Sequence, residues 1–183
     1  CPAFDVNAAC SGFLYALDIA RQYYLNNKKS KILIIGAEKL SRITDWADYR
    51  TCVLFGDGAG AAVLGDGDGD VLYTHILAQG ETGDVLGCGG VGTGLFPQTQ
   101  GKHPRQVLNM DGRKVFEFAV KTFNNSLRQL MEKVGWDNET LSWVLPHQAN
   151  FRIIKEAAKK LKLPIEKFLV NIDHTGNTSA ASI

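Results

Sequence analysis

Apolar residues along this chain fall into two patterns, short continuous runs and longer stretches with helical spacing. The continuous runs predict buried strands, at 3–7, 31–40, 71–79, 141–150 and 168–172. The run before residue 150 continues into a turn, and two more short runs flank a glycine turn within 52–67. The longer stretches predict helices, at 10–27, 111–134 and 151–162.

Strands that alternate with helices indicate an α/β protein with a mixed or largely parallel sheet. Residues 80–106 are rich in glycine, contain two prolines and show no periodicity. We expect a long functional or mobile loop there.

Composition narrows the classes of function. Lys and Arg total 20 against 19 Asp and Glu, which argues against a general nucleic-acid or membrane binder. No run of 18 apolar residues is present. The four cysteines lack CxxC spacing and favour a reduced, cytoplasmic setting. Histidine and cysteine spacing gives no zinc pattern, so we expect no metal.

Both ends of the sequence indicate a piece of a longer protein. The chain begins with Cys1 rather than Met, and it stops in the small-residue run "TSAASI". We therefore expect a fragment of something longer.

Cys10 stands where the first predicted strand passes into the first predicted helix, with alanine, serine and glycine around it. The free N–H groups and the macrodipole of a helix N-terminus stabilise a thiolate, and small neighbours let a substrate approach. Cys10 is therefore a candidate nucleophile, and the alternative is a small buried hydrophobe.

Two other polar residues occupy similar positions. His147 follows a predicted strand in "VLPHQAN". It would therefore lie at the carboxyl edge of the sheet, where ligand-binding and catalytic sites of α/β proteins are found. Asn177 follows Gly176, which allows a tight turn, in "HTGNTSAAS". A structural histidine and ordinary turn chemistry are the alternatives. A cysteine, a histidine and an asparagine that all lie at strand ends beside small residues point to one site.

Four segments carry a resemblance to a known family: "DVNAACSGF", "LFGDGAGAAVL", "PHQANFRII" and "GNTSAAS". In this order they closely resemble β-ketoacyl-acyl carrier protein synthase III, the initiating condensing enzyme of type II fatty acid synthesis. The resemblance runs along essentially all 183 residues. It implies a thiolase-like, layered α-β-α-β-α fold, here an incomplete portion, and a homodimer. Residues 1–70 would end the N-terminal half, and 71–183 would form most of the C-terminal half.

The resemblance also implies a mechanism. Cys10 would attack an acyl-CoA, and His147 and Asn177 would donate hydrogen bonds to the thioester oxygen of malonyl-acyl carrier protein as CO₂ leaves. The acyl oxyanion hole would use the backbone N–H of Cys10 and a glycine that this chain does not contain. No cofactor is expected beyond these substrates.

Further positions follow from the same resemblance. Apolar residues match the acyl pocket: Leu40, Phe55 and Phe116. Three others match the pantetheine tunnel: Gly112, Ala149 and Asn150. The helix after His147 carries a basic face that suits an acidic carrier protein: Arg152, Lys155, Lys159 and Lys160. A solvated helix face is the alternative for each lysine.

Two positions depart from the family. Tyr49, followed by Arg50, stands where the family commonly has an arginine that stacks on the CoA adenine. Glu117 stands where some relatives place a basic docking residue.

Two glycine-rich motifs carry weaker signals. "GDGAGA" (56–61) is similar to a dinucleotide fingerprint, but no helix follows it at once, and in the family it is a structural turn. "GDGDGD" (65–70) has the aspartates of a calcium loop, but Val71 and Leu77 replace its glycine and glutamate. We expect a surface turn.

Two alternatives to the condensing enzyme remain. One is another Cys-His-Asn enzyme, such as a type III polyketide synthase or a specialised-metabolite synthase. A thiolase would need a second cysteine in place of Asn177, and an elongating ketosynthase a second histidine. The other alternative is a non-catalytic protein, either a truncated fragment or an acyl-binding scaffold.

Overall fold

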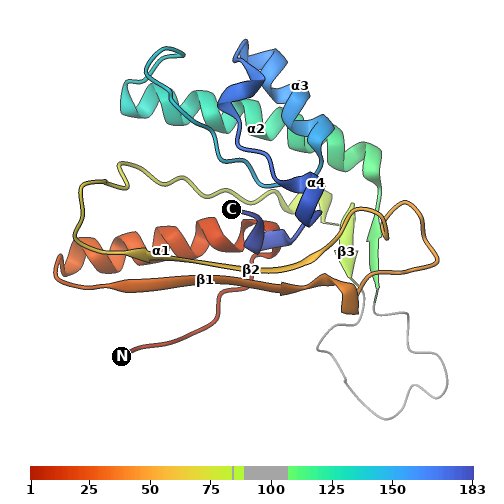
Figure 1. The fold of residues 1–183 in the computed structure, drawn as a ribbon, viewed down its shortest axis with the longest axis horizontal. Coiled ribbons are helices and arrows are strands. Elements are labelled where there is room, and N and C mark those ends of the chain that lie inside the picture. Colours follow the sequence, from red (N-terminus) through yellow and green to blue (C-terminus); the bar gives the residue numbers. More distant parts are fainter. Residues whose placement is uncertain (84, 89–106) are drawn as a thin grey trace.

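A long helix lies along a pair of strands, and two further helices pack together on the other side of the molecule (Figure 1). The computed structural model describes residues 1–83, 85–88 and 107–183. With η for a 3₁₀ turn, the elements in chain order are η1 Ala9–Ser11, α1 Gly12–Asn26, β1 Ile32–Lys39, η2 Leu40–Arg42, β2 Asp57–Leu64, η3 Gly80–Thr82, β3 Leu86–Cys88, β4 Leu108–Met110, α2 Gly112–Val134, α3 Phe151–Leu161, η4 Ile165–Lys167, α4 Ile172–Thr175 and η5 Ser179–Ser182.

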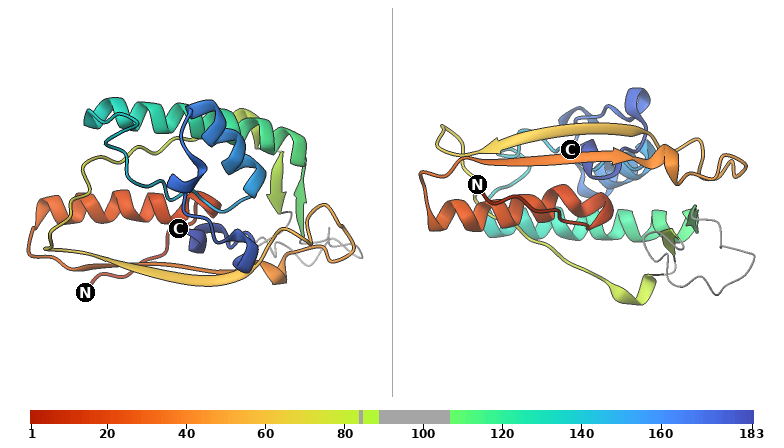
Figure 2. Two further views of the ribbon diagram at one scale, coloured as in Figure 1. Left: turned by 45° about the horizontal axis from the view of Figure 1, so that its top comes forward. Right: turned by 90° about the horizontal axis from the view of Figure 1, so that it is seen from below.

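The strand pair β1–β2 is antiparallel, in register from Ile32 opposite Leu64 to Lys39 opposite Asp57. Alternate residues of β1 point to opposite faces, as the strand geometry requires. Ile34 is buried on the inner face, where α1 and η5 pack. Figure 2 shows α1 lying along the strands. This inner face positions the residues that the sequence singled out.

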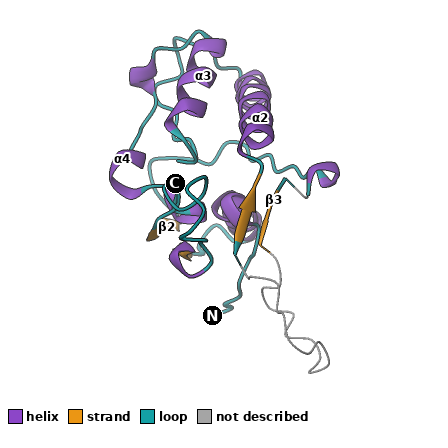
Figure 3. Cartoon of the chain, turned by 90° about the vertical axis from the view of Figure 1, so that its right-hand side faces the viewer, coloured by secondary structure: helices purple, strands orange, loops and turns teal. Residues whose placement is uncertain are grey.

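The second packing unit joins α2 to α3, which lie side by side in Figure 3. Asp111 caps α2 by accepting from the N–H of Lys114, and Gly135, at φ 72°, ends it. The shared core is apolar: Met131, Leu141, Val144, Ile154, Ala158, Leu161, Leu163 and Phe168. The predicted helices at 111–134 and 151–162 are confirmed to within one residue, because their apolar stripes meet in this core.

The predicted helix at 10–27 and strand at 31–40 are also confirmed, as η1–α1 and β1. The strand predicted at 3–7 is wrong: this segment has no regular structure, and Phe4 is 59% exposed. No strand among the described residues pairs with it, and an extended segment without a partner leaves its backbone groups to water.

The strand predicted at 71–79 is wrong as well. The segment runs along α1, whose Arg21 donates to the carbonyls of Val71 (2.8 Å) and Leu72 (3.0 Å). Tyr15 donates to the carbonyl of Leu77. Side chains of a helix therefore satisfy the carbonyls that a neighbouring strand would otherwise bind.

The strands predicted at 141–150 and 168–172 reduce to one parallel bridge, Val144 with Phe168. Because β1–β2 and β3–β4 are antiparallel while the bridges are parallel, the arrangement is mixed. Of the two arrangements that the sequence allowed, mixed or largely parallel, the described residues have the mixed one.

The "GDGAGA" segment is not a turn but most of β2, so one strand replaces the two short segments predicted around it. Its glycines accommodate a neighbouring chain. A Cβ at Gly58 would lie 2.9 Å from Cγ2 of Thr178, and one at Gly36 of β1 would lie 2.9 Å from the carbonyl oxygen of Ala180. Glycine is needed at both positions, at Gly58 for the approach of Thr178 and at Gly36 for the approach of η5.

The "GDGDGD" segment forms an exposed bend, as predicted. Of the glycine-rich stretch at 80–106, residue 84 and residues 89–106 lie outside the described part. Within the described ranges, no helix is long and apolar enough to cross a membrane, and no three metal-ligating side chains gather.

The outer face of β1–β2 generates the first prediction. Leu33, Ile35 and Val63 are 59%, 61% and 67% exposed there, and a contiguous apolar face favours association. Ile35→Lys should reduce self-association of this chain, measured by analytical ultracentrifugation, and should barely change its unfolding free energy.

Its matched control is the neighbour on the opposite face. Ile34 is 4% exposed, so Ile34→Lys would bury a charge and should strongly destabilise the protein. Equal effects of the two substitutions on unfolding would contradict the orientation of β1.

Candidate active site

Cys10 lies in the η1 turn that leads directly into the N-terminus of α1. Ala9 has a φ of 45°, a left-handed conformation that is uncommon and strained for a residue other than glycine and is often found at functional sites. Burial raises the pKa of the Cys10 thiol, and the charge of Glu38 raises it further, while a hydrogen bond with the Ser179 side chain lowers it. The net shift is upward, so the resting thiol is protonated at neutral pH, which corrects the expectation of a stabilised thiolate.

Asn177 is joined to the segment before β2. Its N–H donates to the carbonyl of Leu54 (2.8 Å), and its carbonyl accepts from the N–H of Gly56 (3.0 Å). These bonds form a parallel bridge between Phe55 and Asn177. The side-chain Oδ1 of Asn177 accepts from the N–H of Ser179 at 2.9 Å. The amino group is therefore the part of the amide left to bind a ligand.

His147 lies between the α2–α3 unit and η5. Its Nδ1 is 2.5 Å from Oγ of Ser182. Its Nε2 is buried and has no hydrogen-bond partner among the described residues. Burial lowers the pKa of His147 to about 4, so the imidazole is neutral at physiological pH and carries one N–H.

The side chain of Gln148 fixes the loop that carries His147. It donates to the carbonyls of Pro146 (2.9 Å) and Leu169 (3.0 Å) and accepts from the N–H of Asn171 (3.2 Å). This buried amide thus has protein partners on both its nitrogen and its oxygen. It holds the His147 backbone between two chain segments.

The short turn η5 connects all three candidate residues. Ser179 hydrogen-bonds the Cys10 thiol with its side chain and the Asn177 amide with its backbone. Ser182, at the other end of the turn, contacts His147. The structure therefore brings Cys10, His147 and Asn177 to one place, as the sequence predicted.

Sequence reasoning missed three residues of this network, Gln148, Ser179 and Ser182. The two serines belong to "TSAAS", which was interpreted only as small residues that make space. A sharper signal was available, because a buried hydroxyl or amide must find a partner.

The predicted substrate-binding residues lie at several places. Ala149 and Asn150 line a cavity of about 580 Å³ together with Val53, Leu54 and Gly176. Oδ1 of Asn150 also caps α3 by accepting from the N–H of Arg152 (2.9 Å).

Phe55 bridges to Asn177, whereas Leu40 is the first residue of η2 and is buried. Gly112 is exposed at the start of α2, and the half-buried Phe116 ring lies 5.9 Å from the Arg152 guanidinium.

The basic side chains of α3 are exposed: Arg152, Lys155, Lys159 and Lys160. Glu117, the departure on α2, accepts from Arg113 at 3.0 Å in an exposed pair.

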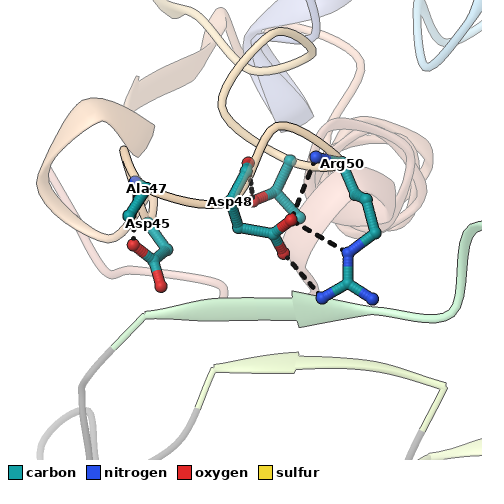
Figure 4. A network of polar contacts seen from close by, with 5 residues as sticks. Asp45, Ala47, Asp48 and Arg50 are labelled. Carbon is teal, nitrogen blue, oxygen red and sulfur yellow. Dashed lines mark hydrogen bonds and ion pairs between the residues drawn. The ribbon is translucent and has the colours of Figure 1, made fainter.

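The second departure lies in the loop after η2, shown in Figure 4. Arg50 donates to both carboxylate oxygens of Asp48, at 2.9 and 3.1 Å, which lowers the pKa of that carboxyl. Tyr49 and Trp46 are 82% and 64% exposed. Two aromatic side chains are thus accessible here while the arginine is turned back onto its own loop.

Comparisons with known proteins give a consistent result. The sequence profile described as 3-oxoacyl-[acyl-carrier-protein (ACP)] synthase III matches residues 4–80, and the profile of its C-terminal part matches 131–183. The chain is 46% identical to the beta-ketoacyl-[acyl-carrier-protein] synthase III of Xanthomonas campestris pv. campestris, over 100% of this chain and 56% of the relative.

Solved structures agree. The crystal structure of 3-oxoacyl-[acyl-carrier-protein] synthase III from Aquifex aeolicus is similar with a TM-score of 0.87 and 45% identity, covering 99% of this chain and 55% of that one. The priming β-ketosynthase of a polyketide biosynthetic pathway gives a TM-score of 0.82 and 32% identity, with coverages of 99% and 54%. These similarities support the predicted thiolase-like fold, and the chain spans about half the length of the relatives it matches.

A prediction follows from the close approach of η5 to β1. In Gly36→Ala, the new Cβ would lie 2.9 Å from a backbone oxygen that has no flexible end to move. We expect a loss of about 1–3 kcal/mol in unfolding free energy, measured by chemical denaturation. Gly67→Ala is the control, since nothing lies within 4 Å of its Cβ, and it should change stability by less than about 0.5 kcal/mol.

A second prediction follows from the withdrawal of His147 from water. Its folded pKa of about 4 lies below the ordinary 6.5. Between these values the unfolded chain binds a proton that the folded chain does not, so stability falls as pH falls. From pH 7 to pH 4, His147 should contribute a loss of roughly 3 kcal/mol. Denaturation series should show this loss in the wild type and not in His147→Gln, and parallel curves would contradict it.

Proposed function

This chain belongs to the 3-oxoacyl-[acyl-carrier-protein] synthase III family, and we propose that it carries the catalytic residues of an acyltransferase. The proposed reaction is the decarboxylative condensation of an acyl-CoA primer with malonyl-acyl carrier protein, which starts fatty acid synthesis. The observation that carries the proposal is the convergence of Cys10, His147 and Asn177 on η5. Because the chain spans 56% of its relative, tests of activity belong on the polypeptide encoded by the full open reading frame.

Cys10 performs the first half-reaction. Its sulfur attacks the thioester carbonyl of the acyl-CoA, the carbon–sulfur bond to CoA breaks, and the thiol proton leaves with the CoA sulfur. A thiol suits this step because it both attacks and departs readily. The hydrogen bond from Ser179 opposes the burial that keeps the thiol protonated.

His147 and Asn177 serve the second half-reaction. When the malonyl group loses CO₂, the electrons of the broken carbon–carbon bond move onto the thioester, whose oxygen becomes negative. Two neutral N–H donors stabilise that oxygen without delivering a proton to it. The enolate carbon then attacks the acyl-cysteine carbonyl and releases the Cys10 thiolate.

The remaining assignments extend this proposal. Leu40, Phe55 and Phe116 contribute to the acyl pocket, and Gly112, Ala149 and Asn150 to the pantetheine path. Arg152, Lys159 and Lys160 on α3 bind an acidic carrier protein. We further propose a cytoplasmic homodimer without a cofactor, in which 1–70 and 71–183 belong to the two halves of the thiolase-like fold.

A second candidate is a priming ketosynthase of specialised metabolism, favoured by the similarity to such an enzyme from a polyketide pathway. For a type III polyketide synthase, the other Cys-His-Asn alternative, presenting malonyl-CoA beside malonyl-acyl carrier protein decides, because those enzymes use the CoA ester. Absence of turnover with either extender would favour a non-catalytic acyl-binding protein.

The proposal predicts separate defects in the two half-reactions. His147→Ala and Asn177→Ala should each slow malonyl decarboxylation by about a hundred- to a thousand-fold, since each removes one donor. Both variants should still accept an acyl group on Cys10. CO₂ release and radiolabel transfer from acetyl-CoA measure the two steps.

Cys10→Ser is the matched variant for the opposite defect. It should lose acylation and retain most decarboxylation. Mass spectrometry should place the acetyl group of the wild type on Cys10, and label on Cys52 or Cys88 would contradict the assignment. If all three variants lost both steps equally, a general collapse of the site would explain them better.

A further inference from the structure

Ser182 lies at the end of η5 with its hydroxyl directed at the imidazole of His147. Oγ is 2.5 Å from Nδ1 of His147, 3.3 Å from the backbone N of Gln148 and 2.9 Å from the carbonyl oxygen of Ser179. Ser182 is 7% exposed, so these protein atoms determine how the hydroxyl is oriented.

A serine hydroxyl has one hydrogen, and here two acceptors compete for it. If it points to Ser179, the imidazole must carry its proton on Nδ1 and donate to Ser182. If it points to His147, Nδ1 accepts and the imidazole proton lies on Nε2. In both cases the N–H of Gln148 donates to Oγ.

The distances favour the second arrangement. Bonds that a hydroxyl donates to oxygen span about 2.5–3.0 Å, whereas bonds that an N–H group donates to oxygen span about 2.7–3.2 Å. The 2.5 Å contact to Nδ1 is at the short end, as a hydroxyl donor gives, while the contact to Ser179 is 2.9 Å.

We infer that Ser182 is a positioning residue: its hydroxyl donates to Nδ1 of His147 and keeps the imidazole proton on Nε2. Nε2 is the buried atom that has no partner among the described residues. With the proton there, it is a donor ready for an oxygen of a ligand. The consequence for catalysis rests on the proposed function, in which His147 donates to the thioester oxygen.

Nitrogen NMR of the substrate-free protein from the full open reading frame tests the tautomer directly. The protein is labelled with ¹⁵N-histidine, and His147→Gln identifies the resonance among the four histidines. We expect the wild type at pH 7 to carry the proton on Nε2. Ser182→Ala should shift the tautomer balance toward Nδ1–H by roughly three- to tenfold, the equivalent of one hydrogen bond. Ser182→Thr retains a hydroxyl and should restore the wild-type balance.

Thr51→Val is the control for the loss of a side-chain hydrogen bond that has only a structural role. Thr51 is fully buried, and its hydroxyl donates to the carbonyl of Asp48 at 3.2 Å. The variant therefore loses a comparable buried bond without touching His147. It should leave the tautomer unchanged.

Kinetics provide the second readout. Ser182→Ala should slow CO₂ release from the malonyl thioester by roughly the same three- to tenfold, while acyl transfer to Cys10 stays close to wild type. Equal slowing of both steps would indicate a displaced η5 and overturn the positioning role.

The outcomes separate this inference from the proposed function. A wild-type proton on Nδ1, or an unchanged balance in Ser182→Ala, overturns the inference even in an active enzyme. The expected tautomers without CO₂ release support Ser182 and refute the proposed function. If Ser182→Ala does not fold, the proton position in the wild type and in Ser182→Thr decides.

Discussion

The site depends on the insertion of one short turn, η5, between the strand pair and the start of α1. Its backbone approaches Gly36, and the preceding Thr178 approaches Gly58, at distances that no side chain on either strand would permit. Hydrogen bonds then extend from its two ends, to Cys10 and Asn177 from Ser179 and to His147 from Ser182. The small residues around the Cys10 thiol therefore make room for η5 as well as for a substrate.

The same enclosure sets the charge state of the site. Withdrawal from water raises the pKa of the Cys10 thiol and lowers that of His147, because burial disfavours the charged form of each. At neutral pH both groups are therefore uncharged. A neutral imidazole can donate to a developing enolate without protonating it. In the proposed reaction this burial slows acylation, because the thiol must lose its proton during the attack.

Sequence patterns predicted the helices and the candidate site residues well, but they predicted poorly which segments pack and hydrogen-bond together. Cys10, His147 and Asn177 could be found because each lies between an apolar run and small residues. The apolar segments at 3–7 and 71–79 were wrongly predicted as strands. An apolar run indicates burial, but it does not show which groups will hydrogen-bond to its backbone. Arg21 of α1 binds the second of these segments. Gly58 was interpreted as part of a turn, whereas Thr178, far along the chain, imposes the need for glycine.

In the proposed reaction η5 supports both half-reactions, and its two ends hold their partners differently. Ser179 has a left-handed φ of 52° and uses both its backbone and its side chain toward Asn177 and Cys10. Ser182 uses only its hydroxyl, which the Gln148 backbone and the Ser179 carbonyl surround. A change confined to the Ser182 hydroxyl can therefore alter His147 without moving the thiol. A change in the turn's backbone would displace all three residues together, which is why close packing against Gly36 and Gly58 matters to the chemistry as much as to stability.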